Sequence, residues 1–342
     1  MVVYPGRVRS GAFEASTVKR AARRRRLRAV PTNTLALNPA LSALVGGVVD
    51  YAGLFPPAAL GMSEAVRAYA GYRDDPARAM LGRFVVPVSR LREFDDAAAT
   101  HLPHDDATPW RLSALTGVDV AADVDLALRF NERHAGDAST GHALVDALEL
   151  KVSTAVEIEA AMSRMPSQFT AYFEIRIVSD PDEIVEVLRR TGGYAKARTG
   201  GVTADAFPTP HELARFMVRC RDAGVAFKLT AGLHHPLRGA HPLTYADDAP
   251  QGTMFGYLNA LAAAMLAWRG HDEMAIVAAL EARDPAFLRA DGATLTVGSD
   301  RLDLAMIAAA RHETMHSFGS CSFREPVDEL PIAAITASSS LH

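Results

Sequence analysis

The sequence is poor in cysteine, has no long apolar run and carries little excess charge. Its two cysteines, Cys220 and Cys321, are too few for a disulfide framework and favour a reducing compartment such as the cytoplasm. No apolar run is long enough to cross a membrane, and the basic N-terminal residues lack the apolar core of a secretory signal. The net charge of -4 and pI near 6.3 give no general attraction to nucleic acid or anionic membranes. We therefore expect a soluble cytoplasmic protein.

Residues 1–38 differ from the rest of the chain in composition. They contain Lys19, Arg20 and the run Arg23–Arg26 with little apolar periodicity, which predicts a disordered or weakly helical arm outside the fold. One interpretation of this arm is a tether to nucleic acid or an anionic surface. The other, which composition favours, is a solvated extension without a role of its own. Residues 332–342 are interpreted as a flexible tail.

The remaining chain alternates short apolar runs with amphipathic segments. The predicted strands cover the end of the segment before Asp50, then 83–88, 110–116, 143–152 and 169–177, two lysine-bearing runs, and 316–323. About eight strands in alternation with helices, in a chain of 342 residues, predict an α/β fold of the (β/α)₈ (TIM barrel) type over residues 39–331, rather than an open doubly wound sheet.

The regular alternation is interrupted between the seventh and eighth strands. Residues from about 240 to 312 are rich in Ala, Leu and Met and predict helices over 252–268 and 272–283, and a third from Asp300, as N-cap, to Arg311. We interpret this segment as a helical insertion over the mouth of the barrel. The alternative is that its helices form a homo-oligomer interface.

The stretch from Gly192 to Arg238 carries a lysine near the end of each of two successive strands. Lys196 and Lys228 are separated by one amphipathic helix, which is the layout of a βαβ unit and places both amines at the same mouth. Repulsion between two ammonium groups, added to burial, predicts that one amine is neutral and nucleophilic. The alternative is that each lysine only pairs with a carboxylate such as Glu149 or Glu174.

Five short motifs resemble, in order, those of the deoxyribose-phosphate aldolase family. They are VVDYAGLFPPA for its first strand, FEI for its fifth, YAKARTGG and FKLTAGLHHP for its two lysine strands, and FGSCSF for its last. The resemblance implies a Schiff-base role for Lys196, a tuning role for Lys228, and proton-handling roles for Asp50 and Glu174. Where the family has a fourth-strand aspartate, this chain has Glu149, one methylene longer.

The resemblance also implies an anion site at the last two turns, where Gly232, Gly319, Ser320 and Ser322 match phosphate-holding positions. Backbone amides and hydroxyl groups at the final loops of a barrel form such cradles. One glycine of the seventh-strand turn is replaced in the run from Thr230 to Gly232, which puts the phosphate in question. The full set of candidate substrate- or anion-binding residues is Arg198, Thr199, Gly200, Thr230, Gly232, His234, His235, Arg238, Gly319, Ser320 and Ser322.

A competing motif lies just before the last strand. Residues from His312 to His316 spell H-E-x-x-H, which on a helix binds zinc in hydrolases, but no third histidine follows at the expected spacing. The sequence therefore predicts a lysine-dependent aldolase or related lyase acting on a small carbonyl compound that bears a phosphate or carboxylate, with no cofactor and no metal. The alternatives are a zinc-dependent hydrolase and a non-catalytic binding protein that uses its basic arm.

Overall fold

The computed structural model describes residues 37–104, 108–136, 138–151, 154–331 and 335. The predicted basic arm (1–38) and C-terminal tail (332–342) therefore lie almost entirely outside the described residues. The organised chain begins with helix α1 (Pro39–Val45), whose N-cap Asn38 accepts a hydrogen bond from the amide of Leu41.

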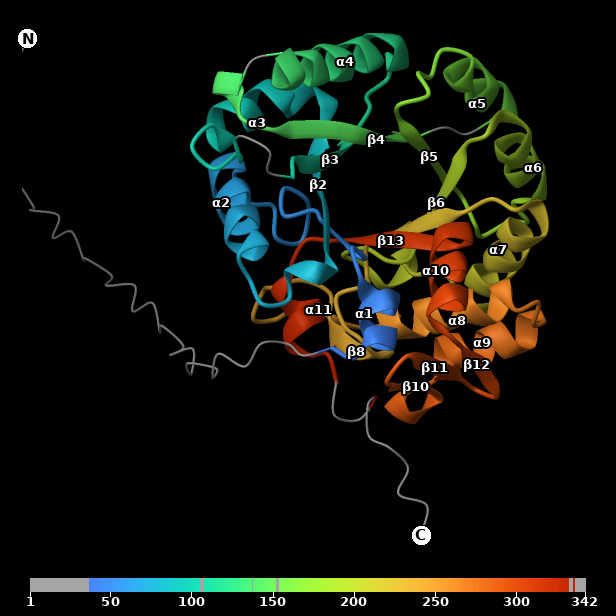
Figure 1. Ribbon diagram of the computed structural model, residues 1–342. Coiled ribbons are helices and arrows are strands. Elements are labelled where there is room, and N and C mark those ends of the chain that lie inside the picture. The colour runs from blue at the N-terminus through green and yellow to red at the C-terminus, as the bar shows by residue number, and fades with distance from the viewer. Residues whose placement is uncertain (1–36, 105–107, 137, 152–153, 332–334, 336–342) are drawn as a thin grey trace, which may run out of the picture. The chain divides into compact units, whose positions relative to one another are not determined.

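Eight parallel strands close into a barrel in the order β1-β13-β7-β6-β5-β4-β3-β2 (Figure 1). The strands are β1 (Val49–Tyr51), β2 (Leu81–Pro87), β3 (Trp110–Leu115), β4 (Ala143–Lys151), β5 (Thr170–Ile175), β6 (Tyr194–Arg198), β7 (Phe227–Thr230) and β13 (Met315–Ser320). The predicted (β/α)₈ architecture is confirmed. Barrels of this kind carry their functional sites at the carboxyl ends of the strands.

Helices surround the barrel as an outer layer (Figure 1). Those that follow the first six strands are α2 (Met62–Arg73), α3 (Leu91–Ala98), α4 (Val120–Gly136), α5 (Ala155–Met162), α6 (Asp182–Thr191) and α7 (Pro210–Ala223). The bounds of α7 follow from the sequence: Thr209 and Glu212 form a capping box and Gly224 ends the helix in a left-handed conformation. Its apolar face packs inward, with Phe216 against Phe227 of β7.

The segment between β7 and β13 contains more than the predicted helices. It forms a hairpin of β8 (Gly239–Pro242) and β9 (Gln251–Met254), then α8 (Tyr257–Trp268) and α9 (Glu273–Glu281), a small sheet of β10 (Leu288–Asp291), β11 (Thr294–Val297) and β12 (Asp300–Leu302), and α10 (Leu304–Glu313). The last strand is followed by α11 (Arg324–Asp328).

Two predicted boundaries in this segment are wrong. The helix predicted to start at residue 252 starts at Tyr257, because the residues before it pair as β9 with β8. Asp300 lies in β12 and does not cap α10; the side chain of Asp303 instead accepts the hydrogen bond from the Met306 amide at the start of that helix. The prediction is wrong by about one helical turn because Asp300 and Asp303 are both suitable N-cap residues and lie three residues apart.

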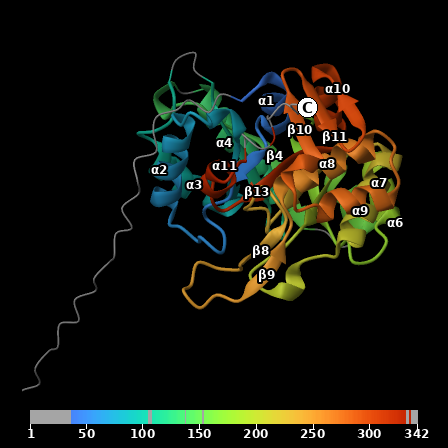
Figure 2. The same ribbon diagram turned by 90° about the horizontal axis from the view of Figure 1, so that it is seen from below.

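Most of the insertion belongs to the outer helical layer. Helix α8 is buried on nearly all sides and packs among α7, α9 and α10. The β8–β9 hairpin is the exception, because it projects away from these helices (Figure 2). The predicted cover over the mouth is therefore formed by the hairpin and not by the helices.

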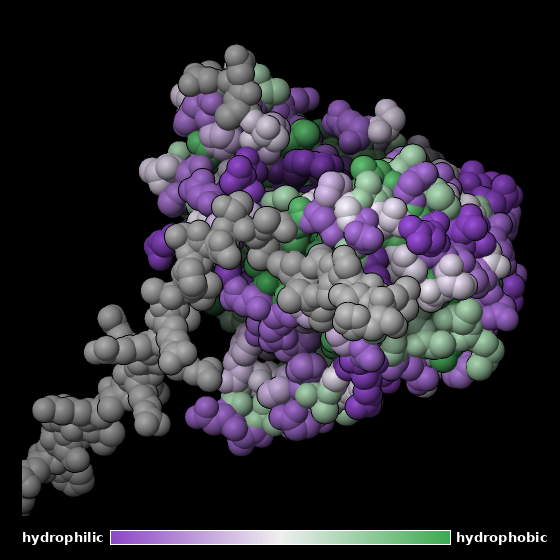
Figure 3. All heavy atoms as spheres, turned by 60° about the horizontal axis from the view of Figure 1, so that its bottom comes forward, coloured by the Kyte–Doolittle hydropathy of each residue, from purple (hydrophilic) through white to green (hydrophobic). Residues whose placement is uncertain are grey.

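On the face of the molecule that Figure 3 shows, the coloured residues are mainly hydrophilic, with smaller apolar areas between them. Of the helices in the described residues, none is long and apolar enough to span a membrane.

The carboxyl ends of β6 and β7 approach each other closely at two glycines. Gly232 has a φ of 72°, and a Cβ atom there would lie 2.9 Å from the Cα of Gly200 and 3.0 Å from the carbonyl oxygen of Thr199. Neither contact is with a flexible side chain, so backbone has to move to make room. The turn after Lys228 therefore depends on glycine both for its φ angle and for space.

We predict that Gly232→Ala destabilises the protein more than Gly224→Ala does. Gly224 has a similar φ of 65°, but a Cβ atom there would have no other atom within 4 Å, so this position isolates the conformational cost. We expect a loss of about 1 kcal/mol at Gly224 and roughly 1–3 kcal/mol more at Gly232 from overpacking. Denaturant unfolding measures both; equal losses would contradict the close approach.

Candidate functional site

A cavity of about 360 Å³ opens at the carboxyl ends of the barrel strands. It is lined by residues of β4, β5 and β6, by the turns after β7 and β13, and by the β8–β9 hairpin. Its charged and titratable lining residues include Glu149, Lys151, Glu174, Lys196, Arg198, His234, His235 and Glu325. So many charged groups in one cavity are typical of a functional site, because burial of charge is costly.

Strand register brings the two lysines together. Lys196 of β6 is the direct neighbour of Lys228 on β7 and of Glu174 on β5. Since residues at the same level of neighbouring strands point to the same side, all three side chains enter the barrel. Lys196 and Glu174 line the cavity, whereas Lys228 lies below its floor and is 1% exposed.

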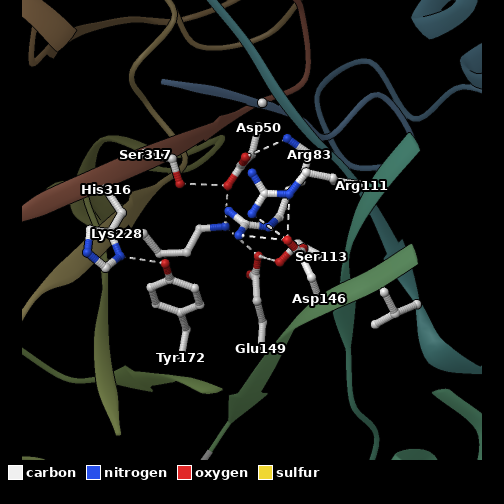
Figure 4. Close-up of polar contacts among 12 residues, drawn as sticks. Asp50, Arg83, Arg111, Ser113, Asp146, Glu149, Tyr172, Lys228, His316 and Ser317 are labelled. Carbon is white, nitrogen blue, oxygen red and sulfur yellow. Dashed lines mark hydrogen bonds and ion pairs between the residues drawn. The ribbon is translucent and has the colours of Figure 1, made fainter. Parts of the chain in front are cut away.

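Lys228 is held between two carboxylates (Figure 4). Its Nζ lies 2.6 Å from Oδ2 of Asp50 and 2.6 Å from Oε1 of Glu149. The ammonium also lies 5.3 Å from the centre of the Tyr172 ring, which attracts cations. The charge of the Lys228 ammonium is therefore balanced by two carboxylates and one aromatic ring.

Lys196 is held by the second oxygen of the same glutamate. Its Nζ lies 2.8 Å from Oε2 of Glu149 and 2.8 Å from Oε2 of Glu174. Glu149 consequently stands between the two amines, one carboxylate oxygen on each. The five residues predicted as catalytic, Asp50, Glu149, Glu174, Lys196 and Lys228, thus form one connected group.

The electrostatics of this group differ from the sequence-based expectation. Burial alone would lower the pKa of Lys228, but Asp50 and Glu149 reverse the effect and raise it. Likewise, burial alone would raise the carboxylate pKa values, but Lys228 lowers that of Asp50, and Lys196 lowers those of Glu149 and Glu174. Lys228 is therefore held in its charged form, and the Glu149 carboxylate lies between it and Lys196, which the expectation of direct repulsion between the amines does not include.

Further polar groups fix the carboxylates in place. The hydroxyl of Ser113 donates to Oε1 of Glu149 at 2.6 Å, and that of Ser317 donates to Oδ2 of Asp50 at 2.7 Å. The backbone amide of Arg83 donates to Oδ1 of Asp50 at 2.8 Å. Sequence reasoning missed these residues, although strand alternation on β13 places Ser317 on the same face as Gly319.

A second group of side chains lies at the cavity wall. Nδ1 of His234 lies 3.0 Å from Oε2 of Glu325, and the same nitrogen is 3.9 Å from the thiol of Cys321. The hydroxyl of Tyr245 from the hairpin donates to Glu325 at 3.2 Å. The sequence predicts neither Glu325 nor Tyr245 as a site residue, and it assigns no base to Cys321. Because Cys321 and Glu325 approach the same nitrogen, the imidazole does not relay a proton between them.

The predicted anion-binding residues divide into two sets. Those that line the cavity are Arg198, Thr230, Gly232, His234, His235 and Gly319. Those outside the lining are Thr199, Gly200, Arg238, Ser320 and Ser322.

The residues outside the lining have partners elsewhere. The Thr199 hydroxyl donates to the Ala231 carbonyl, and the Arg238 guanidinium lies over the ring of Phe255. Ser320 donates its hydroxyl proton to the carbonyl of Ser322 at 2.6 Å, and the Ser322 hydroxyl accepts from the Glu325 amide. The two serines therefore build the turn into α11 and do not form the predicted hydroxyl cradle.

The H-E-x-x-H motif does not adopt the geometry of a helical zinc site. Helix α10 ends at Glu313, and His316 lies on β13. Its Nδ1 lies 2.7 Å from the Tyr172 hydroxyl and its Nε2 lies 2.8 Å from the carbonyl of His312, so neither nitrogen is open to a metal. Within the described part of the chain, no group of three or more His, Cys, Asp or Glu residues is placed to hold a metal ion.

Removal of the buried ammonium has a predictable effect on stability. We expect Lys228→Met to lower the free energy of unfolding at pH 7 by about 3–5 kcal/mol, because it leaves buried carboxylates with too little positive charge. Asp50→Asn in the same chain should restore part of this loss. Urea unfolding of the wild type, the single variant and the double variant measures both effects.

The difference in the free energy of unfolding between the wild type and Lys228→Met should become smaller as the pH falls. In the wild type, the lowered pKa of Asp50 means that its contribution is present above its ordinary value of 3.8 and is lost on acidification below it. In Lys228→Met the pKa of Asp50 rises, so protonation relieves the buried charge at higher pH and the gap between the two proteins narrows. A gap that is constant from pH 7 to pH 4.5 would contradict this account.

Comparison of the chain with known protein families, with curated proteins and with solved structures gives no match. The likeness to the deoxyribose-phosphate aldolase family therefore stands on the short sequence motifs alone. The barrel itself does not specify a reaction, because this fold supports many different activities. What it does supply is a cavity at the end where enzymes of this fold commonly act.

Proposed function

We propose that the protein is a lysine-dependent aldolase or related lyase that forms a Schiff base with a small carbonyl compound. The observation that carries the proposal is Lys196, whose amine reaches the cavity between two carboxylates while the second lysine lies directly behind it. A single buried lysine is explained by one ion pair. Two lysines that share Glu149 below a cavity suggest a site for amine chemistry.

Glu174 is suited to take the proton that Lys196 must lose before it attacks a carbonyl. Its side chain is 15% exposed, at the cavity, whereas that of Glu149 is 3% exposed and is also bound by Lys228 and Ser113. Burial alone would raise the pKa of Glu174, and the charge of Lys196 is the main cause that lowers it. Proton transfer removes that charge, so burial then favours the neutral acid.

The same proton balances the formation of the imine. The neutral amine of Lys196 adds to the carbonyl carbon to give a carbinolamine. Glu174 returns a proton to the hydroxyl group, which leaves as water and yields an iminium ion. Glu174, which is a carboxylate again after this step, takes a proton from the carbon next to the iminium and gives an enamine, whose carbon forms the new carbon–carbon bond. In cleavage the bond breaks to give the same enamine, which takes that proton back.

Lys228 acts on Lys196 through Glu149. Its ammonium, whose pKa is raised, neutralises much of the charge on Glu149 and Asp50. Glu149 therefore attracts Lys196 less strongly than a carboxylate without a second partner would. This effect acts through Glu149 and differs from direct repulsion between the amines.

The cavity favours a small, anionic substrate. Its volume of about 360 Å³ lies at the low end for ligand sites. Lys151 and Arg198 add positive charge near its mouth, and the Arg198 side chain is 53% exposed and 3.8 Å from Glu174. A carboxylate or a phosphate on the carbonyl compound is suited to these groups.

Reductive trapping tests the nucleophile. We expect borohydride, added with acetaldehyde, glyceraldehyde or pyruvate, to give an adduct at Lys196, located by peptide mass spectrometry. Lys196→Met should abolish the adduct, whereas Lys151→Met, which removes another lysine of the same cavity, should retain it. No adduct with any of these compounds, or one at Lys151 or Lys228 instead, would refute the proposal.

The pH dependence of trapping tests the role of Lys228. We expect Lys228→Met to move the pH of half-maximal adduct formation upward by roughly 1–3 units, because Glu149 is then left to Lys196. Glu149→Gln should move it downward, because an amide does not stabilise an ammonium as a carboxylate does. Both measurements are made where the variants are folded, as checked by circular dichroism. Shifts in the same direction, or none, would remove Lys228 from this role.

A further inference from the structure

The second polar group of the cavity is built around His234. The turn of Ala231 and Gly232, both with positive φ, redirects the chain after β7, and the buried Leu233 anchors it. His234 follows directly, is 8% exposed and lines the same cavity as Lys196. The position of its ring is therefore set by the barrel wall and not by a free loop.

One nitrogen of this imidazole is occupied and the other is open. Nδ1 faces Glu325 at 3.0 Å, with the Ser320 hydroxyl at 3.4 Å and the Cys321 thiol at 3.9 Å. Among the described residues, Nε2 has no hydrogen-bond partner. It is also absent from the buried polar atoms that lack a partner, so it is accessible from outside the protein. Since the residue lines the cavity, Nε2 is the nitrogen that a bound molecule can reach.

The neighbours of His234 favour its protonated form. Burial alone would lower the pKa of the imidazole, but its hydrogen bonds to Cys321 and Glu325 raise the pKa to about 9. The other groups around it are Tyr245, which bonds Glu325, and His235, whose ring centre lies 6.5 Å away and whose Nδ1 is held by Glu329. At neutral pH, Nε2 therefore carries a hydrogen toward the cavity.

We propose that His234, oriented by Glu325, is the acid–base residue that serves the oxygen atom of the second carbonyl in the carbon–carbon step. The inference rests on the Schiff-base function proposed above. In the direction of bond formation, the enamine carbon on Lys196 attacks an aldehyde carbon, and the electrons of the C=O bond move to its oxygen, which takes the proton from Nε2. In cleavage, the neutral imidazole removes the hydroxyl proton as the bond breaks and the enamine forms again.

Acetaldehyde separates this step from imine formation, because it serves as both donor and acceptor. In D₂O, exchange of its methyl hydrogens requires only the imine and enamine at Lys196, whereas 3-hydroxybutanal appears only after the carbon–carbon step. We expect His234→Asn to retain exchange and to lower condensation by about 10²–10⁴-fold, the usual contribution of a general acid. His211→Asn, which removes an exposed histidine paired with Glu273, is the matched control and should change neither rate.

The outcomes distinguish the two proposals. Loss of exchange and condensation in Lys196→Met, together with retained exchange and lowered condensation in His234→Asn, supports both. Absence of exchange in the wild type overturns the Schiff-base function, and this inference with it. Unchanged condensation in His234→Asn, an equal loss of both rates, or a raised KM with unchanged kcat overturns the role of His234 alone. The last of these results identifies it as a substrate-binding residue.

Glu325→Gln provides a second test that keeps the imidazole in place. Wild-type condensation should fall as the pH rises through about 9, where the imidazolium loses its proton. Removal of the carboxylate takes away one cause of that raised pKa, so the fall should move to lower pH, while the pH dependence of exchange stays the same. A basic limb that does not move in Glu325→Gln would overturn the assignment, even if His234→Asn failed to fold.

Discussion

The carboxylate of Glu149, shared between Lys196 and Lys228, is the interaction on which the site depends. Each of its oxygens holds one lysine side chain, so its negative charge offsets the repulsion between two lysines at the same end of one barrel. Buried charges of this kind are stable only when every member has partners. Three further donors hold the carboxylates in place: the hydroxyl groups of Ser113 and Ser317 and the backbone amide of Arg83.

The barrel turns this interaction into a directional site. Strand alternation sends Lys196 and Lys228 inward at the same level, but the floor of the cavity lies between them. One amine is consequently open to a ligand and the other is enclosed by protein, although their positions along the strands are equivalent. The two lysines therefore differ in their access to the cavity, although they are direct neighbours in the strand register.

The sequence predicts the features that depend on local patterns, and it does not predict those that depend on contacts between distant segments of the chain. Strand alternation and spacing are sufficient for the barrel and for placing Lys196 beside Lys228, because both follow from local periodicity and a regular topology. The position of Glu149 between the amines depends on how β4 lies across the barrel from β7, which no local pattern encodes. Tyr245 and Glu325 reach His234 from a hairpin and from α11, so their roles appear only once the chain is folded. The error in the start of α10 has a local cause. Asp300 is an N-cap residue type like Asp303, so the sequence does not distinguish the two positions.

The β8–β9 hairpin contributes Leu243, Tyr245 and Met254 to the cavity wall, yet it pairs with none of the eight barrel strands. Its sequence and length are therefore not constrained by the register that positions the lysines. Changes in the hairpin can reshape the pocket while the ion pairs of the two lysines below it stay intact. Under the proposed Schiff-base function, such changes would alter which compound binds without rebuilding the barrel around the lysines.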